Sequence, residues 1–130
     1  MTYDTRLLAD AIQARLASQT SKTIGKGSRP DGADTPYAVV RSTTGPQPEG
    51  SLTDAGQIFR PTFLVFYVGD DSDEAQWMQT EARTALLGWT PTLVGFDLGP
   101  VELDLENVID GPDFDGPVHE IADRFSVYLS

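Results

Sequence analysis

The residues that could do chemistry are one histidine, one glycine-flanked lysine and two acidic clusters. The chain has a single histidine, His119, and no cysteine. A Ser-His-Asp arrangement would need His119 as a base beside a positioned nucleophile, and no nucleophile-elbow pattern precedes it. Without cysteine, thiolate nucleophiles, disulfides and cysteine-ligated metals are excluded. We therefore expect His119 to flank the start of the last strand, and we expect no enzyme.

The segment Gly25-Lys26-Gly27-Ser28 has only a superficial likeness to a phosphate-binding loop. Such a loop needs Gly, four residues and then Gly-Lys-Ser or Gly-Lys-Thr at the start of a helix. Here Arg29-Pro30-Asp31-Gly32 follows, which is a turn sequence with its own mechanism. The sequence predicts a flexible turn and no nucleotide site.

The two acidic clusters offer the oxygen ligands that Ca²⁺ prefers. The first, Asp70-Asp71-Ser72-Asp73-Glu74, is typical of a helix N-terminus, where the helix dipole favours negative charge. The second spans Asp110 to Gly116 and lacks the spacing and terminal Glu of an EF-hand loop. We predict a solvated turn there, with a weak oxygen-ligand site at Asp110, Asp113 and Asp115 as the alternative. No metal or other cofactor is expected.

Two helices are predicted from apolar residues at helical spacing. The first spans Asp4 to Ala17, with its first residue as the cap. The second spans Ser72 to Leu87 and begins with a capping box made by Asp71 and Glu74. Gly88 is placed to stop it, because glycine readily adopts the left-handed conformation that ends helices.

Alternating and β-branched segments predict several strands. They are Tyr37–Thr43, Ile58–Val68, Thr92–Asp97, Val101–Glu106 and Ile121–Leu129, with a weaker candidate near Ile24. Strands outnumber helices without β-α-β alternation. The predicted fold is therefore one α+β domain over residues 1–130, a mainly antiparallel sheet with two helices packed on one face. The predicted core comprises Phe63, Val65, Phe66, Met78, Leu86 and Trp89.

The strand Ile58–Val68 is apolar on both faces, as expected of a strand covered on both sides, while Pro61 indicates an edge or a bulge. Two helices can cover one face of a sheet but hardly both. The second face then needs a cover, from a second sheet of the same chain or from a neighbouring subunit.

The long Gly- and Pro-rich loop Thr44–Gln57 leads into this strand. Its lone apolar residue, Leu52, is either an ordinary exposed leucine or an anchor that orders on docking. The predicted partner-binding residues are Leu52, Ile58, Phe59 and Arg60.

Charge limits the classes of partner. The chain carries 20 acidic and 9 basic residues, a formal charge of −11. Such a field repels phosphate backbones, so specific nucleic-acid binding is not expected. The N-terminus lacks a basic region followed by an apolar stretch, and no run approaches the ~20 apolar residues of a membrane span. Neither export nor membrane insertion is expected, and the absence of cysteine suits a reducing cytoplasm.

The order of these elements resembles that of the tail terminator proteins, which join tail to head in long-tailed bacteriophages. The likeness is carried by an opening helix, a strand after a polar loop, a strand running into a capped helix, the end of that helix and a terminal strand. These segments are Leu7–Ile12, Pro36–Val40, Phe63–Ala75, Ala85–Trp89 and Asp123–Leu129. Together they span nearly the whole chain, and its departures are the loop 44–57 and the acidic stretch 102–106.

The resemblance implies a structural protein of the virion, located at the tail-neck junction and assembled in the host cytoplasm. It implies a homo-oligomeric ring, a hexamer, that ends polymerisation of the tail tube. The implied partners are the major tail tube protein and the head-to-tail connector or stopper protein. The genome would pass through without specific binding. The alternatives are a head-side neck or stopper protein and a monomeric acidic adaptor that binds a basic protein.

A ring of acidic subunits around a DNA channel would repel the passing backbone. We predict that Glu102, Asp104 and Glu106 face this channel. The alternative is that these acids face outward and keep the ring soluble.

Overall fold

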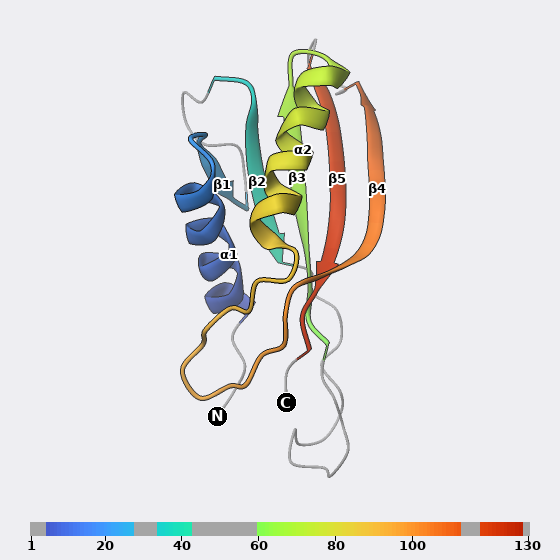
Figure 1. The fold of residues 1–130 in the computed structure, drawn as a ribbon. Helices are drawn as coiled ribbons and strands as arrows, with labels where there is room; N and C mark the ends of the chain where they lie inside the picture. The colour runs from blue at the N-terminus through green and yellow to red at the C-terminus, as the bar shows by residue number, and fades with distance from the viewer. Residues whose placement is uncertain (1–4, 28–33, 43–59, 113–117, 129–130) are drawn as a thin grey trace.

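The computed structural model describes residues 5–27, 34–42, 60–112 and 118–128 (Figure 1). The described residues form the helices α1 (Thr5–Gln19) and α2 (Ser72–Leu86). They also form five strands, β1 (Ile24–Lys26), β2 (Tyr37–Ser42), β3 (Thr62–Gly69), β4 (Glu102–Pro112) and β5 (His119–Ser126). The strands make one sheet in the order β1-β2-β3-β5-β4.

The sheet is mixed, because β1 runs parallel to β2 while the other neighbours are antiparallel. Both helices lie on the same side of the sheet, in front of it in Figure 1. The predicted α+β class with two helices on one face is confirmed, and the parallel β1 is the one departure from an antiparallel sheet.

Helix α2 begins and ends as its sequence predicts. The Asp71 carboxylate accepts a hydrogen bond from the Glu74 backbone N–H at 2.9 Å, which is the N-cap contact. The Glu74 carboxylate accepts a hydrogen bond from the backbone N–H of Asp70 at 3.1 Å. The predicted capping box would have used the backbone N–H of Asp71, one residue later. Beyond the C-cap Leu87, Gly88 has a φ of 82°, a left-handed conformation that turns the chain away from the helix.

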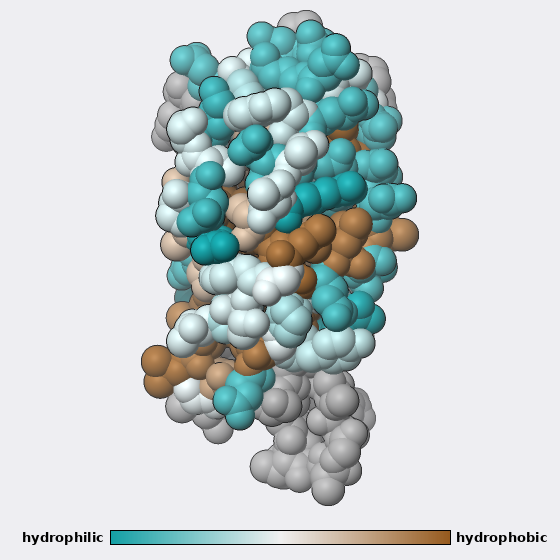
Figure 2. All heavy atoms as spheres, in the orientation of Figure 1, coloured by the Kyte–Doolittle hydropathy of each residue, from teal (hydrophilic) through white to brown (hydrophobic). Residues whose placement is uncertain are grey.

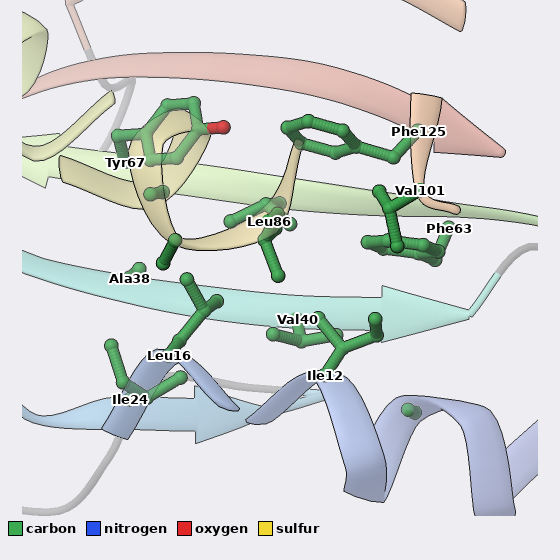
Figure 3. Close-up of a cluster of buried hydrophobic side chains, with 14 of the residues drawn as sticks. Ile12, Leu16, Ile24, Ala38, Val40, Phe63, Tyr67, Leu86, Val101 and Phe125 are labelled. Carbon is green, nitrogen blue, oxygen red and sulfur yellow. The ribbon is translucent and has the colours of Figure 1, made fainter. Parts of the chain in front are cut away.

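The core lies between the helices and the sheet (Figure 3). Alternate residues of β3, namely Phe63, Val65 and Tyr67, are fully buried on this side. Phe63 stacks on Phe125 of β5 with ring centroids 5.4 Å apart. The helices contribute nine further buried side chains, Leu8, Ala9, Ile12, Leu16, Ala75, Met78, Ala82, Ala85 and Leu86.

Two of the predicted core residues are only partly buried. Phe66 packs in a second small cluster with Tyr37, Val39 and Val68, on the helix-free face. The physical reason is the period of two along a strand, which sends Phe66 to the face opposite Phe63. Trp89, just beyond α2, packs against the edge of the main core.

The strand predicted at Thr92–Asp97 is wrong. This segment makes a turn, in which the Phe96 N–H donates to the Leu93 carbonyl at 3.2 Å and Gly95 has a φ of 87°. The positive φ reverses the chain where a strand would continue.

The expectation for Pro61 is also wrong. Pro61 lies just before β3, which is the central strand, so it removes no hydrogen bond from the ladder.

The predicted loop from Asp110 begins later than expected. β4 continues to Pro112, with Asp110 opposite Ile121 and Pro112 opposite His119. An edge strand tolerates proline, because its outward N–H groups need no partner strand.

Candidate interaction surface

A buried carboxylate, Asp123, organises the space between α2 and the sheet. It lies on β5, on the side that faces the helices, and is fully buried. Arg83 of α2 donates two hydrogen bonds to the Asp123 carboxylate, from Nε to Oδ2 at 2.9 Å and from Nη2 to Oδ1 at 2.9 Å. The Tyr67 hydroxyl of β3 donates to Oδ2 at 2.9 Å. One carboxylate thus joins α2, β3 and β5.

The same carboxylate also holds the irregular part of β4. The backbone N–H of Asn107 donates to Asp123 Oδ1 at 3.0 Å, and Asn107 has a φ of 49°. The amide of Gln79 bridges the two residues, donating to Asn107 Oδ1 at 2.7 Å and to Asp123 Oδ1 at 3.1 Å. No buried side-chain nitrogen or oxygen among the described residues lacks a partner. The polar groups of this cluster therefore satisfy one another, and together they hold α2, β3, β4 and β5 in position.

The electrostatics of this network favour the charged carboxylate. Burial alone raises the pKa of Asp123, but hydrogen bonds from Arg83, Asn107 and Tyr67 outweigh it and bring that pKa below its ordinary value. The hydrogen bond to Asp123 raises the pKa of Arg83. Burial, and then the charge of Asp123, raises the pKa of Tyr67 well above its usual range. Asp123 and Arg83 are ionised at neutral pH, and Tyr67 is neutral.

Sequence reasoning missed this network, although one signal was present. The terminal strand alternates Ile121, Asp123, Phe125 and Val127, so an acid occupies a position on the apolar face. A charge there requires a buried partner. The partner could not be named from sequence, because Arg83 is forty residues away on a helix.

A second ion-pair cluster lies at the other side of the sheet. Arg124 Nε donates to Asp104 Oδ2 at 2.5 Å, and Arg60 Nη2 lies 3.3 Å from Asp104 Oδ1. Arg60 Nη2 is also 3.9 Å from Glu102 Oε2, and its guanidinium stacks over the Tyr128 ring at 5.1 Å. Asp104 thus lies between two arginines and is mostly buried.

The three acids predicted to face a channel do not share one face. The alternation of β4 is interrupted by register shifts between Leu103 and Leu105 and between Leu105 and Ile109. Glu102 and Asp104 lie with the arginines of the helix-free face, whereas Glu106 approaches Arg83 of α2, with Oε2 to Nη2 at 3.8 Å. Glu106 is the most exposed of the three, at 67%. Whether any of them faces a channel stays a prediction.

Of the predicted partner-binding residues, only Arg60 is described, and it is exposed. Leu52, Ile58 and Phe59 lie outside the described residues. Arg60 donates from Nε to the buried Ser126 hydroxyl at 2.9 Å, so its stem is anchored to the end of β5.

The remaining candidates have local partners. His119 is the first residue of β5, as expected, and its Nε2 lies 2.7 Å from Asp110 Oδ1. Lys26 of β1 pairs with Asp10 of α1. Within the described ranges, no group of three or more His, Cys, Asp or Glu side chains is arranged to hold a metal. Asp113 and Asp115 lie outside these ranges.

Exposed apolar side chains gather on β4. Leu105 is 48% exposed, Ile109 is 43% exposed and Val108 is 36% exposed. Figure 2 shows hydrophobic residues reaching the edge of the molecule where β4 lies in Figure 1. Among the described residues, neither helix is long and apolar enough to cross a membrane.

The fold is shared with solved proteins along its whole length. A chain from the virion of a native gene transfer agent (GTA) particle aligns with a TM-score of 0.71 over 98% of this chain and 98% of its own, at 14% identity. A second solved chain aligns with a TM-score of 0.65 over 99% of this chain and 97% of its own, also at 14% identity. No protein-family model and no curated protein sequence matches. At this identity the likeness establishes a common fold.

Proposed function

We propose that this chain is a structural, non-enzymatic virion protein that forms a hexameric ring, caps the phage tail tube and joins the tail to the head connector. The observation that carries the proposal is the end-to-end similarity to a chain of a gene transfer agent virion. The order of elements in the sequence, which resembles that of tail terminator proteins, supports the finer assignment.

Two physical features suit a ring that DNA crosses. The formal charge of −11 per chain repels the DNA backbone, so a channel through the ring would not retain the genome. The sheet carries both helices on one side, and exposed apolar side chains lie along β4. Exposed apolar side chains that lie together are typical of surfaces that bind other protein chains.

The test is capping of tail tubes. The purified chain is mixed with polymerising tube protein, and tube length is followed by negative-stain electron microscopy together with co-sedimentation. We expect bound protein at one tube end and arrested growth. Binding to the connector alone would favour the head-side stopper, and a monomer that binds neither would favour the acidic adaptor. Either result would reject tube capping.

A further inference from the structure

We propose that the helix-free face of the sheet, centred on Leu105 and Ile109, is the surface on which a second copy of this chain packs. The helix-free face is defined by the register of the strands, because residues directly opposite in a sheet share a face. Its rows include Phe66 opposite Ala122 and Leu64 opposite Arg124. β4 extends these rows, with Ile109 opposite Ala122 and Leu105 opposite Arg124.

One row of this face is apolar from β2 to β4, namely Val39, Phe66, Ala122 and Ile109, and charged side chains flank it. Val68 and Val39 are buried in the small cluster on this side, and Phe66 packs against them partly buried. Towards β4 the rows end in Ile109 and Leu105, which are 43% and 48% exposed. Burying such side chains against a partner is favourable in proportion to the apolar area removed from water.

The distribution of charge favours another copy of the chain as the occupant. Among the described residues of the helix-free face, Arg41, Arg60 and Arg124 balance Glu102, Asp104 and Glu120, a formal charge of zero. The other described residues carry five bases against eleven acids, a formal charge of −6. A basic partner would be drawn to that acidic remainder. An identical acidic chain meets the least repulsion on the neutral, apolar face.

The contact is made by side chains rather than by adding strands edge to edge. β4 is interrupted by two register shifts, and Asn107 has a left-handed φ, so the outer edge of β4 is a poor template for another strand. At the opposite edge of the sheet, the Ile24 carbonyl of β1 accepts a hydrogen bond from Gln13 Nε2 at 2.8 Å. The described edge strands are therefore poor templates, because β4 is irregular and β1 is three residues long with one carbonyl already occupied. The face of the sheet is the better surface for a partner.

The first experiment measures mass by light scattering at concentrations up to about 100 µM, where a micromolar contact is populated. We expect wild type to assemble and the variant L105S/I109S to be monomeric with a cooperative melt. The matched control is L7S/L87S, which removes leucines that are 47% and 43% exposed and lie away from this face. The control should assemble like wild type. A monomeric wild type, or an L105S/I109S variant that assembles like wild type, would overturn the inference.

A second measurement uses the absence of cysteine in the chain. Single-cysteine variants I109C and L7C are labelled with a thiol reagent at low and high protein concentration. Labelling of I109C should slow by about tenfold when about nine-tenths of the chains are assembled, because only the free fraction reacts. L7C should react at the same rate throughout. Equal protection at both positions, or protection at neither, would overturn the inference.

The inference rests on the assembly expected under the proposed function, but the two fail separately. Assemblies that protect I109C without capping tubes would keep this interface and reject the proposed function. Tube capping by chains whose I109C stays fully reactive would keep the function and reject this interface.

Discussion

At the residue scale, one ion pair specifies how α2 lies on the sheet. A buried carboxylate is costly unless it is paired and fully hydrogen-bonded. Asp123 meets that condition through Arg83, Tyr67, Gln79 and the Asn107 backbone. Its partners come from three other elements, so a shift of α2 or of the β4 irregularity would leave a charge unpaired. The network thereby favours one arrangement.

The first prediction concerns the pH dependence of that network. Asp123→Asn should lower the free energy of unfolding by about 3 to 5 kcal/mol at neutral pH, as when one partner of a buried ion pair is removed. Because the folded-state pKa of Asp123 is lowered from 3.8, its stabilisation is present above that pH and is lost as the pH falls below it. The difference in the free energy of unfolding between wild type and Asp123→Asn should therefore become smaller in acid.

Urea unfolding at about pH 7 and about pH 3 checks this first prediction, with the slope compared between proteins. Tyr67→Phe is the control, since it keeps the carboxylate. It should cost about 1 to 2 kcal/mol and keep most of the pH dependence of wild type, because Arg83 and Asn107 still lower the pKa of Asp123. A gap between wild type and Asp123→Asn that does not change with pH would contradict the assignment.

The second prediction separates the two faces of β3. Phe63→Ala should cost about 3 to 5 kcal/mol, because Phe63 is fully buried and stacked on Phe125. Phe66→Ala should cost less in the monomer, because Phe66 is partly buried on the helix-free face. Thermal and chemical unfolding of the two variants measure the difference. Equal losses would show that the faces are equally covered within one chain.

At the element scale, the junction of β3 and α2 is the most closely fitted part of the fold. A Cβ atom at Gly69 would lie 2.5 Å from the backbone nitrogen of Ala75, closer than real contacts allow. Glycine is therefore required where the strand leaves the sheet and meets the first turn of the helix. The side chain of Asp71 then caps that turn.

The third prediction concerns this junction. Asp71→Ala should reduce stability by about 1 kcal/mol, because it removes the acceptor for the Glu74 N–H. Asp71→Asn keeps an acceptor and should cost less. Gly69→Ala should be worse than either, because the added methyl meets backbone atoms. Denaturant midpoints of the three variants give the ranking, and a harmless Gly69→Ala would contradict the geometry.

At the scale of the whole molecule, charge is distributed unevenly. The acids outnumber the bases, yet the helix-free face is balanced by arginines that hold Asp104 and Glu102. Reversal of Asp104 would bring a third cation beside two arginines and damage the fold. Glu106 is mostly exposed and lies 3.8 Å from one arginine, Arg83, so its reversal should cost less.

The fourth prediction follows from that distinction. If Glu106 lines the channel of the proposed ring, particles carrying Glu106→Lys should assemble and eject their genome more slowly, because the new cation attracts the DNA backbone. The effect should weaken as salt rises, since screening limits it to about 10 Å at ordinary salt. Glu81→Lys is the matched control, because it makes the same change of charge on α2 instead of β4. Normal ejection kinetics for Glu106→Lys would place that residue outside the channel.

The fifth prediction is that folding needs no metal. Thermal melts with chelator, without chelator and with added Ca²⁺ should superimpose, because a bound ion raises the melting temperature only when a site exists in the folded state. A clear Ca²⁺-dependent rise would direct attention to Asp110, Asp113 and Asp115.

Local chemistry in the sequence determined the elements. The capping residues of α2, the stop at Gly88 and the alternation of β3 act through hydrogen bonds and side-chain directions between near neighbours. The α+β class and the placement of both helices on one face followed from the number and order of those elements. The charge of −11 and the absence of cysteine limited the partners and the chemistry without any structure.

Only the tertiary structure decided the contacts between distant segments. In the sequence, Asp123 is one charged residue on the apolar face of a strand. Its partners become known only from the packing of α2 against β5. Which face Phe66 occupies depended on where the helices pack, because both faces of its strand are apolar. The acids of β4 were separated by register shifts, which arise from pairing with β5 and have no local signature.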